Sequence, residues 1–480
     1  MNKKNIYLAA IILIPIIALF LRFFMIDARP MYFDEGTHWL SFINKIYTGE
    51  TLIYIPDFHG FLSWYLSVLP LYVFGLSIFS LRFMSVFFSF LTVCLVFLLR
   101  KDLGKIGTIL AALFLAISPA MIYYSRQVSQ YPYLVFFTLA SFVSLVYYFK
   151  EKKKIYFYLF AASIGFSFVT HEIVVIYLAA MATFLILMYH SNYKIREIMK
   201  KEFNRIKKEK YSLLVISLII IALIVIVIMS CFFTNLKTLF DYLSQSSFAF
   251  NKSFNTGHNK NMFYYLKTFI SLELFAFTGT FLSIFLLRRN IFNLFLFYWT
   301  GFSIVIFSII PYKVPWMFIL ILLPMYLLSA SVFDNIYTKL KMKKEKIVFY
   351  ILIGIFLVYL IATSVNINYI NSYSKNNPLN YAGPVKDNFR LINDLNNVIK
   401  SNETKILFLG DNFWPLHYYL RDKKNYFARE DTNISKFYDD YDFFIVVKEE
   451  KYDSSKLREL GVYELRVNYY IKVLYKNNPK

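Results

Sequence analysis

The chain contains repeated apolar stretches of about twenty residues, separated by short polar or charged connections. A helix of that length rises about 30 Å, which matches the hydrocarbon thickness of a bilayer. Hydrophobic residues make up 58% of the 480 residues, and the mean hydropathy is +0.49. The pattern predicts an all-α polytopic membrane protein. The candidate spans are 6–24, 80–99, 107–124, 131–149, 155–170, 172–189, 212–233, 263–287, 291–310, 316–335 and 347–366.

Lysine and arginine in the connections predict which side each connection faces. The formal net charge is +22, and the positive residues cluster between spans. If the ambiguous apolar segment 61–79 does not cross, the five basic connections share a side with the N-terminus, which the positive-inside rule makes cytoplasmic. Segment 61–79 is then interfacial, re-entrant or a pair of short crossings, and the helix count is about eleven to thirteen. The basic connections are 100–105, 150–154, 194–210, 288–289 and 339–346.

This charge distribution favours contact with membrane lipid headgroups over a nucleic-acid partner, which is not expected. The first 24 residues lack a small-residue cleavage site and are interpreted as a retained span. Cys94 and Cys231 lie in separate spans. Their positions predict no structural disulfide and provide no metal-ligand spacing.

The C-terminal part has a different pattern. "KILFLGD" and "DFFIVV" indicate buried strands, "NFRLINDLNNVIK" has helical periodicity, and "YELRVNYYIKVLYK" indicates further strand. We therefore predict a membrane domain over 1–366, with 25–79 as its outer-face loop, and a small α/β domain over 367–480. The predicted topology makes this C-terminal domain extracytoplasmic.

An acidic pair, Asp34 and Glu35, follows the first span. Acidic residues ahead of the amphipathic segment "THWLSFINKIY" favour the N-terminus of a helix dipole. The same carboxylates are candidates for a general base beside a lipid-borne substrate. His38 lies one turn after Asp34, where it would either hydrogen-bond that carboxylate or face solvent.

The other ionisable residues of the predicted outer face also have two interpretations each. Arg126, followed by Gln130, would bind headgroups or hold a phosphate with its guanidinium. Tyr131 is either part of the interfacial aromatic belt or a ligand. Lys313 opposes the positive-inside trend, which indicates an anionic partner or simple solvation.

Two further outer connections contribute candidates. His59 either belongs to a polar capping loop or joins the rim of a pocket. His171 and Glu172 form an ionisable pair in a turn with almost no loop to solvate them, which favours a functional role. Glu273 lies inside the 263–287 segment. An intramembrane carboxylate needs a partner or a polar cavity, so Glu273 is a candidate to hold residues of the site in place without contacting the substrate.

Charged candidates thus gather on one membrane face, and few lie near the midplane. A transporter is expected to place ionisable groups near the midplane. The distribution favours a catalytic pocket at the outer leaflet.

Several motifs resemble those of polytopic GT-C glycosyltransferases that use polyprenyl-phosphate sugars, a class with protein O-mannosyltransferases and aminoarabinose transferases. Within this class the chain is most similar to an archaeal family named flippase-activity-associated membrane proteins. The likeness covers nearly the full length. The motifs are "YFDEGTHW", "GLSIFSLRFMSV", "SPAMIYYSRQVSQYPYL", His59-Gly60, His171-Glu172, "PYKVPW" (311–316) and "WPLHYYLR" (414–421).

The resemblance implies sugar transfer with inversion from a polyprenyl (dolichyl) phosphate to a glycan, protein or lipid acceptor on the extracytoplasmic face. It implies that Asp34 is the base, that Glu35 positions a substrate, and that Arg126 and Lys313 bind the departing phosphate. No metal and no cofactor beyond the lipid-linked co-substrate are expected. The chain has glutamines at 127 and 130 where many relatives have an acidic residue. The alternative is a non-enzymatic partner of a lipid-carrier flippase that binds a lipid-linked sugar phosphate.

Overall fold

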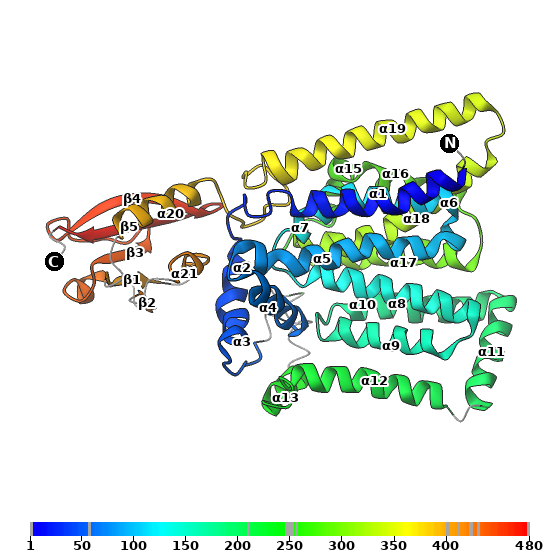
Figure 1. Cartoon of the computed structure of the whole chain (residues 1–480), viewed down its shortest axis with the longest axis horizontal. Helices are drawn as coiled ribbons and strands as arrows, with labels where there is room; N and C mark the ends of the chain where they lie inside the picture. Colours follow the sequence, from blue (N-terminus) through cyan, green and yellow to red (C-terminus); the bar gives the residue numbers. More distant parts are fainter. Residues whose placement is uncertain are drawn as a thin grey trace. The chain divides into compact units, whose positions relative to one another are not determined.

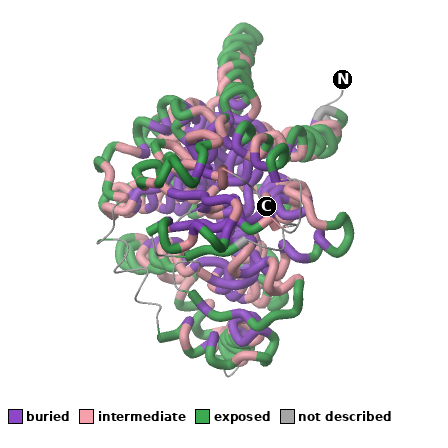
Figure 2. Tube along the Cα trace, turned by 90° about the vertical axis from the view of Figure 1, so that its left-hand side faces the viewer, coloured by how far each residue is buried: buried purple, intermediate pink, exposed green. Residues whose placement is uncertain are grey.

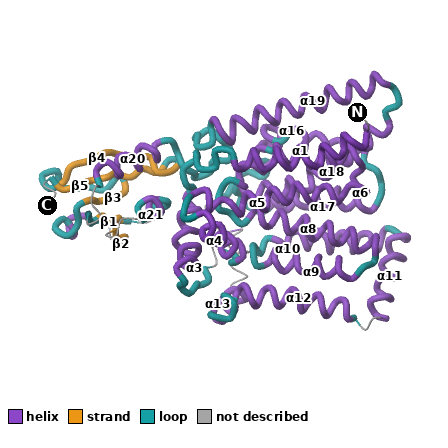
Figure 3. The backbone as a smooth tube through the Cα atoms, in the orientation of Figure 1, coloured by secondary structure: helices purple, strands orange, loops and turns teal. Residues whose placement is uncertain are grey.

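The computed structural model describes residues 3–55, 59–208, 211–244, 254, 258–399, 404–410, 413–421, 426–429 and 433–477. The chain divides into two compact units (Figure 1). Unit 1 comprises Met1–Phe24 and Gly49–Ile370, and unit 2 comprises Met25–Thr48 and Asn371–Lys480. The named elements in the described part of unit 1 are helices, whereas the named strands belong to unit 2 (Figure 3). The predicted fold class, an all-α membrane part with a small α/β part, is confirmed.

The helices of unit 1 follow the apolar stretches of the sequence. They are α1 (Lys3–Phe23), α4 (Leu62–Phe74), α5 (Ile78–Val96), α6 (Arg100–Ile117), α7 (Pro119–Ser125), α8 (Tyr131–Glu151), α9 (Lys154–Phe168), α10 (Val174–Ser191), α11 (Tyr193–Lys208), α12 (Ser212–Met229), α13 (Leu236–Ser244), α15 (Tyr264–Leu272), α16 (Leu274–Leu286), α17 (Ile291–Ile309), α18 (Phe318–Lys339) and α19 (Lys343–Val365).

Among the described residues, 7 helical segments are long and apolar enough to cross a membrane. The longest, Ile78–Ile117, has 40 residues. It contains α5 and α6, which pack against each other, and the helical geometry breaks at Gly104 near the start of α6, where φ is 79°. Shorter apolar helices cover Tyr7–Phe23, Leu62–Phe74 and Lys154–Phe168. The chain is therefore a multi-pass membrane protein.

Helix α18 lies at the centre of unit 1 and packs against α6, α16 and α17. In the most apolar window of α18, 89% of the residues are buried, compared with 17% for α12. The corresponding share is 28% for the segment that contains α19, and Figure 2 shows buried positions in the interior with exposed positions on outer segments. Because membrane helices at the edge of a bundle expose apolar side chains to lipid, α12 and α19 are expected to be lipid-facing.

The ambiguous segment 61–79 folds as the short helix α4 followed by a turn. Helix α4 has 13 residues, a rise of about 20 Å, which is less than the hydrocarbon thickness. Gly75 ends it with φ 74°, and Ser77 caps α5 by accepting a hydrogen bond from the backbone N–H of Ser80. This geometry favours an interfacial or re-entrant segment.

The segment 263–287 differs from the continuous span that the sequence predicts. Helices α15 and α16 meet at an angle of 112°, with Glu273 at the break. The Glu273 carboxylate accepts hydrogen bonds from Ser118 Oγ (2.7 Å) and the Ala120 N–H (3.1 Å), and also from Tyr326 Oη. These bonds to α7 and α18 hold the bend, because an unpaired carboxylate in the interior would be costly.

Unit 2 contains a 5-stranded sheet in the order β2-β1-β3-β5-β4. Strand β1 pairs in parallel with β2 and β3, whereas β5 pairs antiparallel with β3 and β4. Alternate residues of β1 enter two separate apolar clusters, so both faces of the sheet are covered. The elements are α2 (Phe33–His38), α3 (Asn44–Thr48), α20 (Asp387–Val398), β1 (Ile406–Leu409), α21 (Leu416–Tyr419), β2 (Tyr426–Arg429), β3 (Phe443–Val447), β4 (Leu457–Arg466) and β5 (Tyr469–Lys476).

Candidate functional site

The acidic pair lies in the first turn of α2, in unit 2. The Glu35 carboxylate is fully buried, and its Oε2 accepts a hydrogen bond from the backbone N–H of Tyr32 at 2.7 Å. This bond satisfies a donor at the start of the helix, as in a capping box. Asp34 is partly exposed, and His38 is buried at the end of the helix. Glu35 therefore shapes the helix, while Asp34 remains the candidate base.

Unit 1 brings together four other predicted residues. His59 Nδ1 lies 2.8 Å from Glu172 Oε1. The rings of His59 and His171 stack at 3.6 Å between centroids and 20° between planes. Tyr131 Oη lies 3.1 Å from His171 Nε2. We call His59, Tyr131, His171 and Glu172 the histidine cluster.

The backbone fixes His59 against the turn that follows α9. The Gly60 N–H donates to the Thr170 carbonyl (3.3 Å), and the Leu62 N–H donates to the Val169 carbonyl (3.0 Å). A Cβ at position 60 would lie 2.1 Å from the Val169 oxygen, so this approach requires glycine. His59 itself has φ 65°, a left-handed conformation that costs about 1–3 kcal/mol and that the surrounding contacts must offset.

Hydrogen bonds also indicate where the protons of the cluster reside. The Ile173 N–H donates to His171 Nδ1 at 3.2 Å, so neutral His171 carries its proton on Nε2 and donates it to Tyr131 Oη. The Trp316 side chain also hydrogen-bonds Tyr131, and an indole can act only as a donor. With both contacts accepted by its oxygen, Tyr131 retains its own O–H as a donor for a ligand.

Glu172 is the negative charge of this cluster. Burial by itself would raise the pKa of Glu172, but His59 and His171 outweigh burial and hold that pKa below its usual range. The carboxylate is therefore ionised at neutral pH. Side-chain exposure is 21% for His59 and 19% for Glu172, so the pair is accessible from one side.

Three of these side chains have the donor types of a metal site. The ligand atoms of His59, His171 and Glu172 lie within 4.8 Å of one another. However, metal-binding imidazoles direct their nitrogen lone pairs at a common point, and stacked parallel rings do not. The Ile173 N–H also occupies His171 Nδ1. The arrangement fits a hydrogen-bonding cluster better than a metal centre.

Arg126 and Lys313 make contacts of a different kind. The Arg126 guanidinium donates to the carbonyls of Asn368 (2.8 Å) and Phe24 (2.9 Å), and it lies 4.6 Å from the centre of the Tyr369 ring. These contacts tie the end of α1 to the end of α19.

The Lys313 Nζ donates to the Ile310 carbonyl at 2.6 Å, within its own turn. Burial lowers the pKa of Lys313. In these contacts Arg126 and Lys313 bind backbone carbonyls rather than members of the histidine cluster.

Gln130 is buried immediately before α8, and Glu273 binds the start of α7 as described above. Trp316 contacts Tyr131 but is not among the site residues predicted from the sequence. Its place in the "PYKVPW" motif is the sequence feature that could have indicated it.

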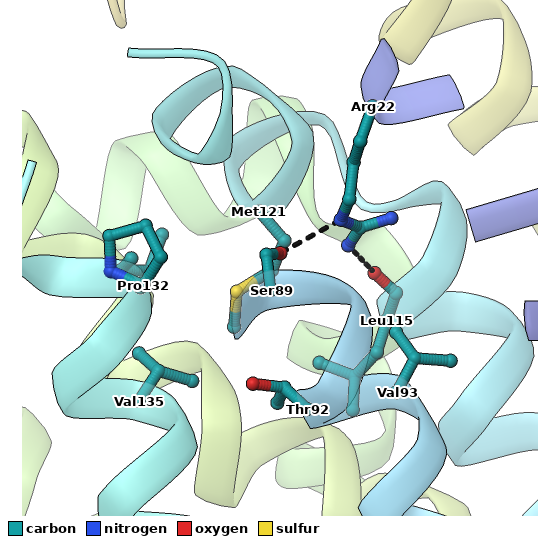
Figure 4. A pocket seen from close by; sticks show the side chains of 9 residues that line it. Arg22, Ser89, Thr92, Val93, Leu115, Met121, Pro132 and Val135 are labelled. Atoms are coloured by element: carbon teal, nitrogen blue, oxygen red, sulfur yellow. Dashed lines mark hydrogen bonds between the residues drawn. The ribbon is translucent and has the colours of Figure 1, made fainter. Parts of the chain in front are cut away.

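A small cavity inside unit 1 has a structural explanation (Figure 4). Arg22 is 1% exposed there. Its Nε donates to Ser89 Oγ (2.8 Å), and its other nitrogens donate to carbonyls that include those of Leu115 and Ala116 at the end of α6. A cation at that position stabilises the helix C-terminus. The cavity is lined by Arg22, Ser89, Thr92, Val93, Leu115, Met121, Pro132, Val135 and Ile319, a set that contains no predicted site residue.

Residues 53–243 match the family described as dolichyl-phosphate-mannose-protein mannosyltransferase. The chain also has the fold of ArnT from Cupriavidus metallidurans bound to undecaprenyl phosphate, with 11% identity, a TM-score of 0.68, and 99% of each chain covered. The apo state of that protein gives a TM-score of 0.65 at 11% identity, over 98% of each chain. No curated protein sequence matches the chain. The chain therefore has the fold of ArnT, and the predicted resemblance to polytopic GT-C glycosyltransferases is confirmed. The nearer likeness to an archaeal flippase-activity-associated family stays a prediction.

Proposed function

We propose that the protein transfers a sugar from a polyprenyl phosphate to an acceptor hydroxyl on the extracytoplasmic face, with inversion at the anomeric carbon. The observation that carries this proposal is the full-length GT-C fold, shared with a structure that holds undecaprenyl phosphate. The match of residues 53–243 to a dolichyl-phosphate-mannose-dependent family supports the same donor class. The proposed sugar is a hexose, and the proposed carrier is a dolichyl phosphate.

In this reaction Asp34 removes the proton of the acceptor hydroxyl. The acceptor oxygen then forms a bond to the anomeric carbon as the bond from that carbon to the phosphate oxygen breaks. The electron pair leaves with the polyprenyl phosphate, and attack from the opposite face inverts the configuration. A general base of this kind contributes about 100- to 10,000-fold in rate.

The histidine cluster is proposed to bind the donor. The Tyr131 O–H offers a donor to a phosphate or sugar oxygen, and the free Nε2 of His59 can accept a hydrogen bond from a sugar hydroxyl, while Glu172 fixes the orientation of His59. Arg126 and Lys313 are proposed to bind the phosphate by exchanging a backbone carbonyl for a phosphate oxygen. His171 and Gln130 are proposed to line the same site.

The proposed orientation places the N-terminus in the cytoplasm and the C-terminal domain outside. Helix α11 supports it, because this basic amphipathic helix lies between α10 and α12 and suits the anionic cytoplasmic leaflet. The connection between α18 and α19 carries five lysines within residues 339–346 and belongs to the same side.

The test is a transfer assay with purified protein in proteoliposomes and a set of polyprenyl-phosphate sugars. Wild-type protein is expected to release free polyprenyl phosphate in step with glycosylated acceptor. Asp34→Asn should bind the donor normally and transfer at least about 100-fold more slowly, while the matched control Asp241→Asn on α13 should remain active. Donor binding without transfer across the whole set would favour the non-enzymatic carrier-binding alternative.

A further inference from the structure

The loop that carries Asp34 and Glu35 forms a single compact unit with the C-terminal domain, which we also call the tail. Residues Met25–Thr48 belong with Asn371–Lys480 rather than with the membrane helices that flank them in sequence. Helix α2, which carries Asp34, packs against α21 of the tail. Helix α21 lies in the "WPLHYYLR" motif, for which the sequence suggested no structural partner.

Gly36 on α2 packs closely against Pro415 beside α21. A Cβ built on Gly36 would lie 2.7 Å from Pro415 Cα and 2.9 Å from Pro415 Cβ. Because real Cβ atoms do not approach other carbons so closely, any side chain at position 36 must displace one of the two backbones. Glycine in the middle of a helix costs about 1 kcal/mol relative to alanine. The packing accounts for its presence here.

Side chains from the tail hold the residues on either side of Asp34. The Met31 N–H donates to Tyr419 Oη at 2.9 Å, and Tyr32 Oη donates to the Tyr381 carbonyl at 2.7 Å. The Arg466 guanidinium lies 4.5 Å from the centre of the Phe33 ring.

The helix is also held after Asp34. Trp39 and Tyr418 meet edge to face, with 5.7 Å between ring centroids and 89° between planes. Trp39 is 2% exposed and Tyr418 is 3% exposed, so this contact belongs to the interior of unit 2. Tail residues therefore anchor α2 both before and after the partly exposed Asp34.

We propose that the C-terminal domain sets the position of the Asp34 carboxylate, with Pro415, Tyr418 and Tyr419 as positioning residues. This inference rests on the proposed function, in which Asp34 is the base. A carboxylate on a six-residue helix would otherwise sample many orientations, and a displacement of about 1 Å can cost about 100-fold in rate. The tail then acts on the catalytic step itself, apart from any contact that it makes with the acceptor.

The first experiment compares Gly36→Ala with Gly301→Ala in full-length protein. Position 301 has open space for a Cβ, so both variants gain helix propensity, and the clash is confined to position 36. Gly36→Ala should lower kcat about 10- to 100-fold with the KM values for donor and acceptor within about twofold of wild type. Gly301→Ala should match wild type. Adding Pro415→Gly to Gly36→Ala should recover part of kcat, because it removes the Pro415 Cβ and frees the opposing backbone.

A second readout does not depend on activity. Hydrogen exchange of the segment 25–48 should be faster in Tyr419→Phe, which removes the acceptor of the Met31 N–H. The segment should be unchanged in Tyr452→Phe, whose hydroxyl makes a long 3.4 Å contact with Glu459.

The outcomes separate this inference from the proposed function. Full kcat in Gly36→Ala, or a loss that appears only as a higher acceptor KM, would overturn positioning and leave sugar transfer intact. Full activity in Asp34→Asn would remove the base, and the exchange data would then report a structural contact alone. Unchanged exchange in Tyr419→Phe would show that the tail does not hold the loop.

Discussion

His59 and Glu172 are 113 residues apart in sequence, and their side chains meet at 2.8 Å between Nδ1 and Oε1. The contact joins the loop after the first span to the turn between α9 and α10. It holds a partly accessible imidazole against an ionised carboxylate, where a lipid-linked anion is proposed to bind.

Glu172→Gln is expected to weaken donor binding. The amide keeps the shape of the side chain but removes the charge that orients His59, and a loss of about 1.4 kcal/mol corresponds to a tenfold change. The donor KM should rise about tenfold, measured by titration with a polyprenyl-phosphate sugar. Glu197→Gln is the matched control, because Glu197 pairs with Lys200 on the surface of α11. An unchanged donor KM in Glu172→Gln would remove the histidine cluster from the donor site.

Gly60→Ala is expected to destabilise unit 1. The new methyl group would meet the Val169 carbonyl at 2.1 Å, and overpacking of this kind costs about 1–3 kcal/mol. Thermal unfolding in detergent should show a lower Tm, and donor binding should fall with the displacement of His59. Gly354→Ala, at a position with open space, should retain the wild-type Tm. A wild-type Tm in both variants would contradict the close approach.

The stability of unit 2 should fall in mild acid because of His417. Burial lowers the pKa of His417 from 6.5 to about 4, so the unfolded chain binds a proton in this range and the folded chain does not. The stabilisation is complete above about pH 6.5 and is lost as the pH falls toward 4, for a total of about 3 kcal/mol. Because His417 lies on α21, hydrogen exchange of the segment 25–48 should accelerate over the same range.

His417→Gln should flatten this dependence between pH 6.5 and 4.5. The exposed His190 provides the control, since His190→Gln should keep the wild-type profile. A wild-type slope in His417→Gln would assign the acid sensitivity to another group.

Chelation is expected to leave transfer unchanged. The stacked rings of His59 and His171 do not converge on a common point, and the proposed transfer needs a base and phosphate-binding groups from the chain itself. Activity after treatment with EDTA should remain within about twofold of the untreated enzyme. A loss that added Zn²⁺ or Mn²⁺ restores would contradict this expectation, and the same loss in His171→Ala without chelator would locate the ion.

The sequence predicted much of the fold because apolar length and charge placement are local properties. It gave the multi-pass helical class, the ambiguous character of 61–79, and the strands and helix of the tail. It did not predict the 112° break at Glu273, because that bend depends on Ser118 and Tyr326, which are far away in sequence.

The sequence also predicted some of the residues of the candidate site. Residue types and short outer turns singled out His59, His171 and Glu172, but their mutual geometry depends on how two connections pack. The contacts of Arg126 with Asn368 and Phe24 depend likewise on distant chain segments.

The sequence by itself determined that this chain spans a membrane many times and carries a separate α/β tail, because hydropathy and periodicity follow from consecutive residues. Tertiary structure decided that Asp34 belongs to the same compact unit as Pro415. That choice required the backbones at Gly36 and Pro415, about 380 residues apart in sequence, to meet, and only packing selects such a contact.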